Sequence, residues 1–155
     1  MQRSSSESIL IISEVMLPNQ ANVAGNIHGG EIMKLMDLAA YAVARRFAHT
    51  NVVTARVDEL EFHLPIFIGD LVICTAQVAY AGKSSMEVVV TVEVEDLECS
   101  DRKKALTAFF TMVSLDKKGK TNLVPELILN TPEERAAFHE GKKRYEWYKA
   151  KRNQS

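Results

Sequence analysis

The chain has 155 residues, of which 46% are hydrophobic and 25% are charged, the balance of one globular domain with a core of its own. Its 19 basic and 20 acidic side chains leave a formal net charge of −1, which excludes the strongly basic surface typical of nucleic-acid-binding proteins. We therefore expect a single domain over residues 1–155, with its core at about 8–116.

The expected cellular location follows from the termini and the cysteines. The first residues lack the long apolar segment of a secretory signal peptide, and no apolar run approaches the length that spans a membrane. Cys74 in an apolar run and Cys99 in a polar turn lack the spacing of a metal site and suggest a compartment that keeps thiols reduced. These features predict a cytoplasmic protein that neither binds nucleic acid nor inserts into membranes.

A strand, a loop and a long helix are expected in the first third of the chain. Residues 1–7 are polar and expected to be loose, whereas residues 9–15 are rich in β-branched side chains and predict a strand. A polar loop with Gly25, Gly29 and Gly30 follows and leads into a helix over about residues 31–47. This helix is apolar around most of its circumference, which predicts that it is largely buried.

The start of this helix is the first candidate for chemistry. Unpaired backbone amides just after Gly29 would attract a negative or developing-negative oxygen. Asp37 lies at the edge of the apolar arc, where a carboxylate is costly unless it is paired, hydrated or functional. It either forms a salt bridge with Lys34 or with another subunit, or it acts on a substrate together with the nearby Asn26.

Four strands are expected after the helix, over residues 52–64, 71–80, 85–95 and 104–115. In the first of them the alternation changes phase at Asp58 and Glu59, which suggests a bulge or a strong bend. Short connections between consecutive strands favour antiparallel pairing. The sequence therefore predicts an α+β fold, with one antiparallel sheet and the long helix on one face.

The apolar faces of these strands favour self-association. One strand carries a run of valines on a single face, Val88, Val90, Val92 and Val94. The flanking strands are also apolar, and we expect their apolar side chains on the opposite face: Ile73 or Val72, Leu106, Ala108, Phe110 and Met112. One helix cannot cover both faces, and a sheet of about five strands has free edges, so we expect at least a homodimer.

A second helix is expected over about residues 132–152. Thr131 is a favourable N-cap, Pro132 suits the first turn and Glu134 completes a capping box. The last turns hold a basic cluster of Lys142, Lys143, Arg144, Lys149, Lys151 and Arg152. This cluster is either a solvated helix end, where cations are favourable, or a binding site for phosphate groups.

The motifs, taken together, resemble a known family. A strand, the loop G-N-I-H-G-G, a helix with M-K-L-M-D, and then L-P-I-F-I-G-D and A-G-K-S-S are similar to the hotdog-fold acyl-CoA thioesterases. The branch is that of the bacterial YciA-type enzymes and the brain-type acyl-CoA hydrolases. The resemblance implies hydrolysis of fatty acyl-CoA to fatty acid and CoA without a cofactor or metal. It also implies a sheet wrapped around the central helix, in a homodimer that assembles into a homohexamer, a trimer of dimers.

The same resemblance implies roles for particular residues. Asp37 of one chain and Asn26 of the other act on the thioester, and backbone amides around Gly29 and Gly30 hold the oxyanion. Independently of the resemblance, His28 in the loop is expected either to orient the backbone or to touch the substrate. CoA runs along a strand connection and onto basic residues near the chain end, here Gly82, Lys83, Ser84, Ser85, Lys142, Lys143 and Arg144.

Other functions remain compatible with parts of the sequence. A non-catalytic acyl-CoA-binding or sensing protein would share the fold. His63, followed by Leu and Pro, is faintly similar to the hotdog dehydratases, which use a His and a Glu, but the helix here carries Asp37. Met33, Met36 and Tyr41 are candidates for an acyl-chain groove, although methionines at helical spacing are more often part of a core.

Overall fold

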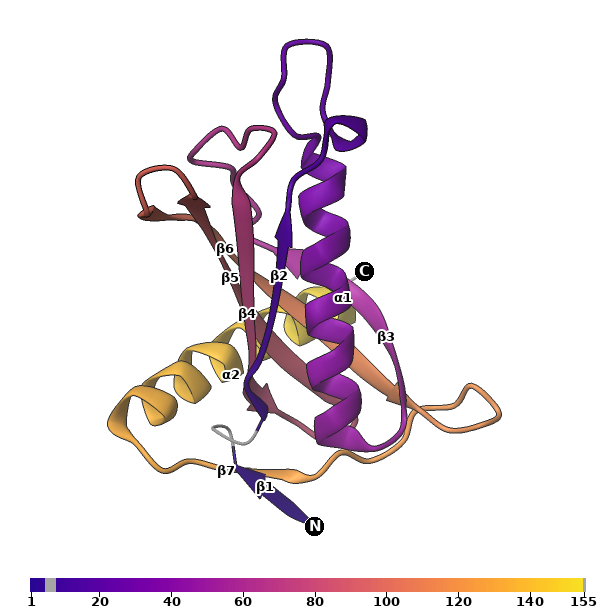
Figure 1. Cartoon of the computed structure of the whole chain (residues 1–155). Helices are drawn as coiled ribbons and strands as arrows, with labels where there is room; N and C mark the ends of the chain where they lie inside the picture. Colours follow the sequence, from indigo (N-terminus) through magenta and orange to yellow (C-terminus); the bar gives the residue numbers. More distant parts are fainter. Residues whose placement is uncertain (5–7, 155) are drawn as a thin grey trace.

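A five-stranded antiparallel sheet curves around one long helix, and a second helix lies outside the sheet (Figure 1). The structure is a computed structural model that describes residues 1–4 and 8–154. Its elements are β1 (Gln2–Ser4), β2 (Leu10–Val15), a short 3₁₀ turn (Pro18–Gln20), α1 (Gly29–Ala48), β3 (Asn51–Asp58), β4 (Leu71–Ala81), β5 (Ser85–Asp96), β6 (Asp101–Leu115), β7 (Glu126–Ile128) and α2 (Pro132–Asn153). The sheet order is β2-β4-β5-β6-β3, and the α+β fold expected from the sequence is confirmed.

The helix α1 packs against the inner face of the sheet. Its covered side includes Met36 and Val43, which are fully buried, and Phe47, which is 1% exposed. The helix ends at His49, whose φ of 57° is left-handed and whose amide donates to the carbonyl of Arg45 at 2.8 Å. The long buried helix is therefore confirmed, and it begins two residues earlier than expected.

The apolar side chains of β5 and its neighbours share this inner face. Val90 pairs with Ala76 on one side and with Ala108 on the other, and all three are fully buried in one core with α1. Directly paired residues project to the same face of a sheet. The expectation that the apolar residues of β6 lie opposite the valines is therefore wrong, because α1 covers both sets: Leu106, Ala108, Phe110 and Met112 as well as Val88, Val90 and Val92.

The strand β3 differs from expectation in its length and in the position of its bulge. It ends at Asp58, where Glu59 takes a left-handed φ of 59°, and residues 60–64 are not in a strand. The register changes between Thr54 and Arg56, not at Asp58 and Glu59. Thr54 is opposite Met112 and Arg56 is opposite Thr111, so Ala55 is the extra residue of a β-bulge.

The helix α2 lies on the outer face of the sheet, on the side away from α1 (Figure 1). Its predicted start is confirmed, because Thr131 Oγ1 accepts a hydrogen bond from the amide of Glu134 at 3.1 Å. Gly141 is buried, and a Cβ there would lie 2.8 Å from Cβ of Tyr80. The absence of a side chain thus allows α2 to approach β4 closely.

A small parallel ribbon outside the main sheet pairs β1, near the start of the chain, with β7, which precedes α2. In it Gln2 is opposite Glu126 and Arg3 is opposite Leu127. The expectation that residues 1–7 are loose is therefore wrong for Gln2–Ser4, and its remaining part, residues 5–7, lies outside the described residues.

The edges of the main sheet are β2 and β3. Both carry exposed apolar side chains: Ile11 is 61% exposed on β2, and Val53 is 43% exposed on β3. An edge strand presents unpaired backbone groups to any strand that approaches it. These edges, rather than a second apolar face, are the features of the fold that favour association with another copy.

Candidate active site

The loop before α1 is held by the side chain of Asn22. Its Oδ1 accepts the amides of Ala24 at 3.0 Å and Asn26 at 3.1 Å, and its own amide donates to the carbonyl of Asn26 at 2.8 Å. Asn26 also bridges to Phe67 through the backbone. The backbone of Asn26 is therefore fixed, while its half-buried carboxamide has no hydrogen-bond partner among the residues described.

The first backbone amides of α1 are free and exposed. His28 occupies the cap position without a side-chain cap, and its amide donates to the carbonyl of Gln20 at 3.0 Å. Within residues 1–4 and 8–154, no hydrogen-bond acceptor lies against the amides of Gly29 and Gly30. A helix start with free donors is suited to hold a negative oxygen, as the sequence suggested.

Asp37 lies on the open side of α1 and is held by a residue that the sequence reasoning did not identify. Thr54 of β3 donates its hydroxyl to Asp37 Oδ1 at 2.6 Å, a short bond typical of a charged acceptor. No ion pair joins Asp37 and Lys34 in the described part of the chain. In the sequence, Thr54 is distinguished only as a polar residue between Val53 and Ala55. Its partner Asp37 lies 17 residues earlier, so no local pattern connects the two.

The surroundings of Asp37 are apolar and open. Met33 is 37% exposed, Leu38 is 53% exposed and Tyr41 is 36% exposed, all on the same helix. Met36, in contrast, is fully buried, so this residue belongs to the core and not to a groove. Asp37 and the free amide of Gly30 are seven residues apart, which is roughly 10 Å along a helix.

The predicted CoA-binding residues Gly82–Ser85 form the connection between β4 and β5. The amide of Gly82 donates to the carbonyl of Ser85 at 2.8 Å, and the carbonyls of Lys83 and Ser84 accept the amides of Val124 and Ser114 at 3.0 and 2.9 Å. The side chain of Lys83 is exposed. Ser85 also lines a small hollow with Gly141 and Tyr145 of α2, so this connection and the second helix are neighbours.

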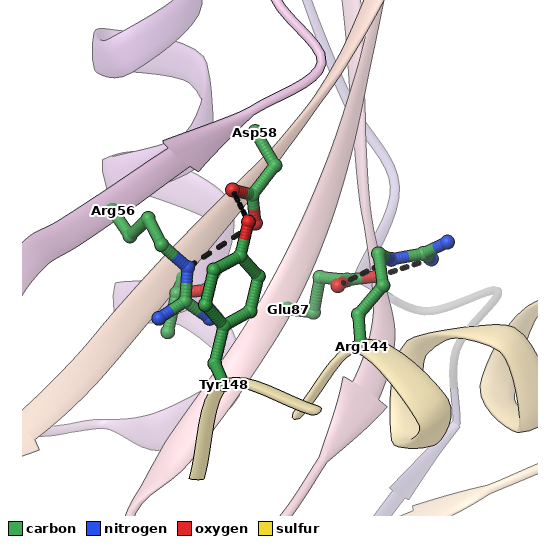
Figure 2. Close-up of polar contacts among 6 residues, drawn as sticks. Arg56, Asp58, Glu87, Arg144 and Tyr148 are labelled. Carbon is green, nitrogen blue, oxygen red and sulfur yellow. Dashed lines mark hydrogen bonds and ion pairs between the residues drawn. The ribbon is translucent and has the colours of Figure 1, made fainter. Parts of the chain in front are cut away.

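The three predicted basic residues of α2 differ in their surroundings. Lys142 and Lys143 are exposed, and Lys143 lies 3.4 Å from Glu140. Arg144 instead binds Glu87 of β5 through two hydrogen bonds, of 2.9 and 2.7 Å (Figure 2), and this raises the pKa of the guanidinium. Glu87 is only 5% exposed, so this bidentate pair is largely shielded from water. The main role of Arg144 is therefore to attach α2 to the sheet.

The described residues contain neither a cluster of metal ligands nor a membrane-spanning helix. No three His, Cys, Asp or Glu side chains lie close enough together to hold a metal ion within residues 1–4 and 8–154. No helix in the same part of the chain is long and apolar enough to cross a membrane.

Comparison with known proteins identifies close relatives. The family model described as "Thioesterase superfamily" matches residues 24–100. The human "Cytosolic acyl coenzyme A thioester hydrolase" is 41% identical over 137 residues, which are 87% of this chain and 36% of that protein. The Escherichia coli "Acyl-CoA thioester hydrolase YciA" is 33% identical over 119 residues, which are 75% of this chain and 90% of that protein. The chain thus spans 36% of the length of its human relative.

Solved structures give the same result over the whole chain. The acyl-CoA hydrolase of Staphylococcus aureus, in complex with butyryl coenzyme A, coenzyme A and coenzyme A disulfide, has a TM-score of 0.89 at 33% identity and covers 99% of this chain and 94% of that one. The same enzyme has been solved with an asparagine, a threonine or an aspartate replaced by alanine. An apo hexameric acyl-CoA thioesterase has a TM-score of 0.91 at 31% identity, with 97% and 96% covered.

Proposed function

We propose, because this chain belongs to the thioesterase superfamily of acyl-CoA thioester hydrolases, that it hydrolyses fatty acyl-CoA to a free fatty acid and CoA. Family membership confirms the resemblance inferred from the sequence. The observation that carries the proposal is the 2.6 Å hydrogen bond from Thr54 to Asp37 on the open side of α1. It fixes one carboxylate oxygen and leaves the other free to accept a proton.

The variants of the S. aureus enzyme support the assignment of Asp37 and Thr54. Its replaced aspartate and threonine are separated by 17 positions, the same separation as between Asp37 and Thr54. The third replaced residue is an asparagine 15 positions before the aspartate, which is the separation of Asn22 from Asp37 here, whereas Asn26 lies 11 positions before Asp37. We assign the base to Asp37 and its positioning to Thr54. The binding of the carbonyl or the water is assigned to Asn26, because its carboxamide is free among the described residues while Asn22 Oδ1 accepts two backbone amides; Asn22 is the alternative that the spacing favours.

The site requires two copies of the chain. A reacting carbonyl must lie about 3 Å from both the base and the oxyanion donors, whereas Asp37 and Gly30 of one chain are roughly 10 Å apart along α1. We therefore place Asp37 and Thr54 of one subunit opposite Asn26 and the helix start at Gly29 and Gly30 of the other. His28, which precedes this helix start, faces the same substrate.

The exposed surface supports a homodimer of this kind. The apolar side chains beside Asp37, namely Met33, Leu38 and Tyr41, are partly exposed in the single chain, and the edge of β3 is free. Pairing of two copies would cover both features. A similar acyl-CoA thioesterase is hexameric, which supports a further assembly of three dimers.

The reaction follows from these positions. A water molecule gives a proton to Asp37 while its oxygen bonds to the thioester carbon, and the carbonyl oxygen becomes an oxyanion held by the amides of Gly29 and Gly30. The C–S bond then breaks, and the CoA thiolate takes the proton from Asp37. Direct attack by Asp37 through a mixed anhydride is the second route, and rapid-quench mass spectrometry of the protein detects that intermediate.

The CoA phosphates require cations near the β4–β5 connection. Lys83, Lys142 and Lys143 are exposed, and we assign the phosphate contacts first to them. Arg144 shares its charge with Glu87, so its contact with CoA is a secondary part of the proposal. The backbone and hydroxyls of Gly82, Ser84 and Ser85 line the path of the pantetheine.

The whole chain, residues 1–155, is proposed as one hydrolase domain in the cytoplasm that uses no cofactor. The name of the human relative includes "Cytosolic". Both cysteines described by the structure are free thiols, which fits a reducing compartment.

Release of free CoA from a panel of short to long acyl-CoAs tests the proposed activity. Detection by mass spectrometry is preferable to a thiol reagent, because exposed Cys99 would react as well. Asp37→Asn changes charge and basicity without changing shape, so we expect turnover to fall more than tenfold while CoA binding persists. Binding of acyl-CoA without any turnover by the wild type would support the sensing alternative instead.

Complementation between inactive chains tests the two-subunit site. Asn26→Ala and Asp37→Ala proteins are each expected to be nearly inactive. In a heterodimer of the two, one site retains Asp37 from the first chain and Asn26 from the second, so mixing should restore activity after subunit exchange. A mixture that stays inactive, with exchange shown by native mass spectrometry, would place both residues within one chain or remove one from catalysis.

A further inference from the structure

We propose that Arg56, Asp58 and Tyr148 form a clamp between α2 and β3 that positions Thr54 against Asp37. These three residues, here termed the outer clamp, lie on the face of the sheet away from α1. The inference rests on the proposed function, because it concerns the residue that holds the proposed base.

The outer clamp is closely packed and fully paired. Tyr148 donates its hydroxyl to Asp58 Oδ1 at 2.6 Å, and Arg56 Nε lies 3.2 Å from Asp58 Oδ2 (Figure 2). The guanidinium carbon of Arg56 lies 3.4 Å from the centre of the Tyr148 ring, and Nη2 donates to Thr111 Oγ1 at 3.2 Å. The hydrogen bond to Asp58 also raises the pKa of Tyr148. One residue of α2 thus holds two residues of β3.

The clamp is also partly shielded from water. The side chain of Asp58 is 10% exposed and that of Arg56 is 25% exposed. Exposed ion pairs contribute little because water competes for both charges, but this pair is covered by the tyrosine ring. Loss of one member would leave a charge with few alternative partners.

The outer clamp lies next to a β-bulge in β3, and through this bulge it affects Thr54 on the inner face of the sheet. In a regular strand, residues two apart project to the same face. Here Thr54 is opposite Met112 and contacts Asp37 on the inner side, whereas Arg56 is opposite Thr111 and stacks on α2. The bulge at Ala55 is therefore what allows one side chain to reach the site and the other to reach α2.

The bulge has no other strong restraint on the outer side. Ala55 is exposed and has only a methyl group, and Val53 is 43% exposed. β3 is an edge strand, so pairing with β6 alone fixes its register. If the bulge were lost, with Ala55 opposite Thr111, Arg56 would turn to the inner face, and the local bend of β3 beside Thr54 would relax. Fixation of Arg56 on α2 prevents that change.

The helix that carries Tyr148 is itself firmly attached. The Arg144–Glu87 pair lies one turn earlier on α2 (Figure 2), and Gly141 contacts β4 one turn before that. The ring of Phe138 lies 4.9 Å from the ring of Tyr80. These contacts give Tyr148 a fixed place from which to hold β3.

Two substitutions test the proposal by crystallography and by kinetics. Arg56→Met keeps the apolar stem and removes the polar contacts of the guanidinium with Asp58 and Thr111, while Tyr148→Phe keeps the ring and removes the bond to Asp58. We expect Thr54 Oγ1 to move out of hydrogen-bond distance of Asp37 Oδ1 in Arg56→Met. We also expect kcat to fall on the order of tenfold, because small displacements of reacting groups cost about that much or more, while KM stays within about twofold. Tyr148→Phe should show the same changes to a smaller degree.

Two control variants separate positioning from stability. Glu146→Gln changes an exposed side chain of α2 two residues before Tyr148, and should leave kcat and structure unchanged. Phe138→Ala removes a ring contact about three turns before Tyr148, while Gly141 and the Arg144–Glu87 pair still attach the intervening part of α2, so it should lower the melting temperature while kcat is retained.

A double-mutant cycle with Thr54→Val completes the test. If the clamp acts through Thr54, Arg56→Met lowers kcat in the wild type and has no further effect in the Thr54→Val protein. The proposal would be overturned if kcat of the double variant fell by the product of the two single-variant losses. A Thr54–Asp37 distance that is unchanged in Arg56→Met would overturn it as well. Failure of the proposed function would give a different result, because the wild type would then hydrolyse no acyl-CoA. In that case the Thr54–Asp37 distance in the crystal structure of Arg56→Met would still decide whether the clamp positions Thr54.

Discussion

Replacement of Thr54 by Val removes one hydroxyl from the proposed site and nearly preserves the shape of the side chain. The hydroxyl donates to Asp37 at 2.6 Å, and a hydrogen bond to a charged group contributes about 1.5–3 kcal/mol. If the bond holds the carboxylate in its reactive orientation, this energy is lost from the transition state. At about 1.4 kcal/mol per factor of ten, we expect kcat to fall roughly 10- to 150-fold with little change in KM.

The same chemical change at Thr107 is a matched control. Thr107 lies on β6, opposite Thr91 of β5, and its Oγ1 is buried without a partner among the residues that the structure describes. Thr107→Val therefore removes an unsatisfied hydroxyl, so we expect unchanged turnover and a gain of about 1 kcal/mol in the free energy of unfolding. Steady-state release of CoA and urea denaturation measure both quantities. Turnover by Thr54→Val within threefold of wild type would show that the hydrogen bond does not serve catalysis.

Four further predictions concern packing, thiol reactivity, the pH dependence of stability and CoA binding. Gly141→Ala places a Cβ 2.8 Å from Cβ of Tyr80, so we expect a net loss of about 1–2 kcal/mol in urea denaturation despite a gain of about 1 kcal/mol in helix propensity; stability equal to wild type would show that α2 does not pack so closely. Burial raises the pKa of Cys74 to about 12, so only Cys99 should react rapidly with a thiol reagent in the native protein, and two rapidly reacting thiols would contradict the buried position. The same shift means that stability falls as the pH rises from 9.0 to about 12, because the unfolded thiol ionises first, and Cys74→Ala should reduce this slope. Lys83→Ala should raise KM several-fold and leave kcat unchanged, and added salt should raise the wild-type KM; a KM unaffected by either would remove Lys83 from the phosphate site.

The sequence was sufficient for the elements whose pattern is local. The apolar circumference of α1, the alternation in β5 and the cap at Thr131 each depend on neighbours a few residues away, and the structure contains all three. The loop motif before α1, together with Asp37 in that helix, was sufficient to identify the family. These signals are properties of single segments, which need no knowledge of what packs against them.

The features that were missed depend on contacts between distant segments. Thr54 faces Asp37 only because a bulge at Ala55 sets the register of β3, and alternation alone placed the irregularity at Asp58 instead. The face on which Phe110 lies is set by its pairing with Val88, which the sequence of one strand does not contain. The attachment of Arg144 to Glu87 joins residues 57 positions apart, so a cluster that suggested phosphate binding is partly a structural anchor.

The ribbon of β1 and β7 also has a consequence for synthesis on the ribosome. Gln2 and Glu126 are 124 positions apart, so β1 is translated long before the strand with which it pairs. At about 5–20 residues per second, that interval is roughly 6–25 s. During this time β2, α1 and the main sheet can assemble, while β1 remains an unpaired edge available to a chaperone or to another nascent chain. The ribbon can therefore form only after nearly the whole domain has been translated, and we expect its hydrogen bonds to be among the last to form.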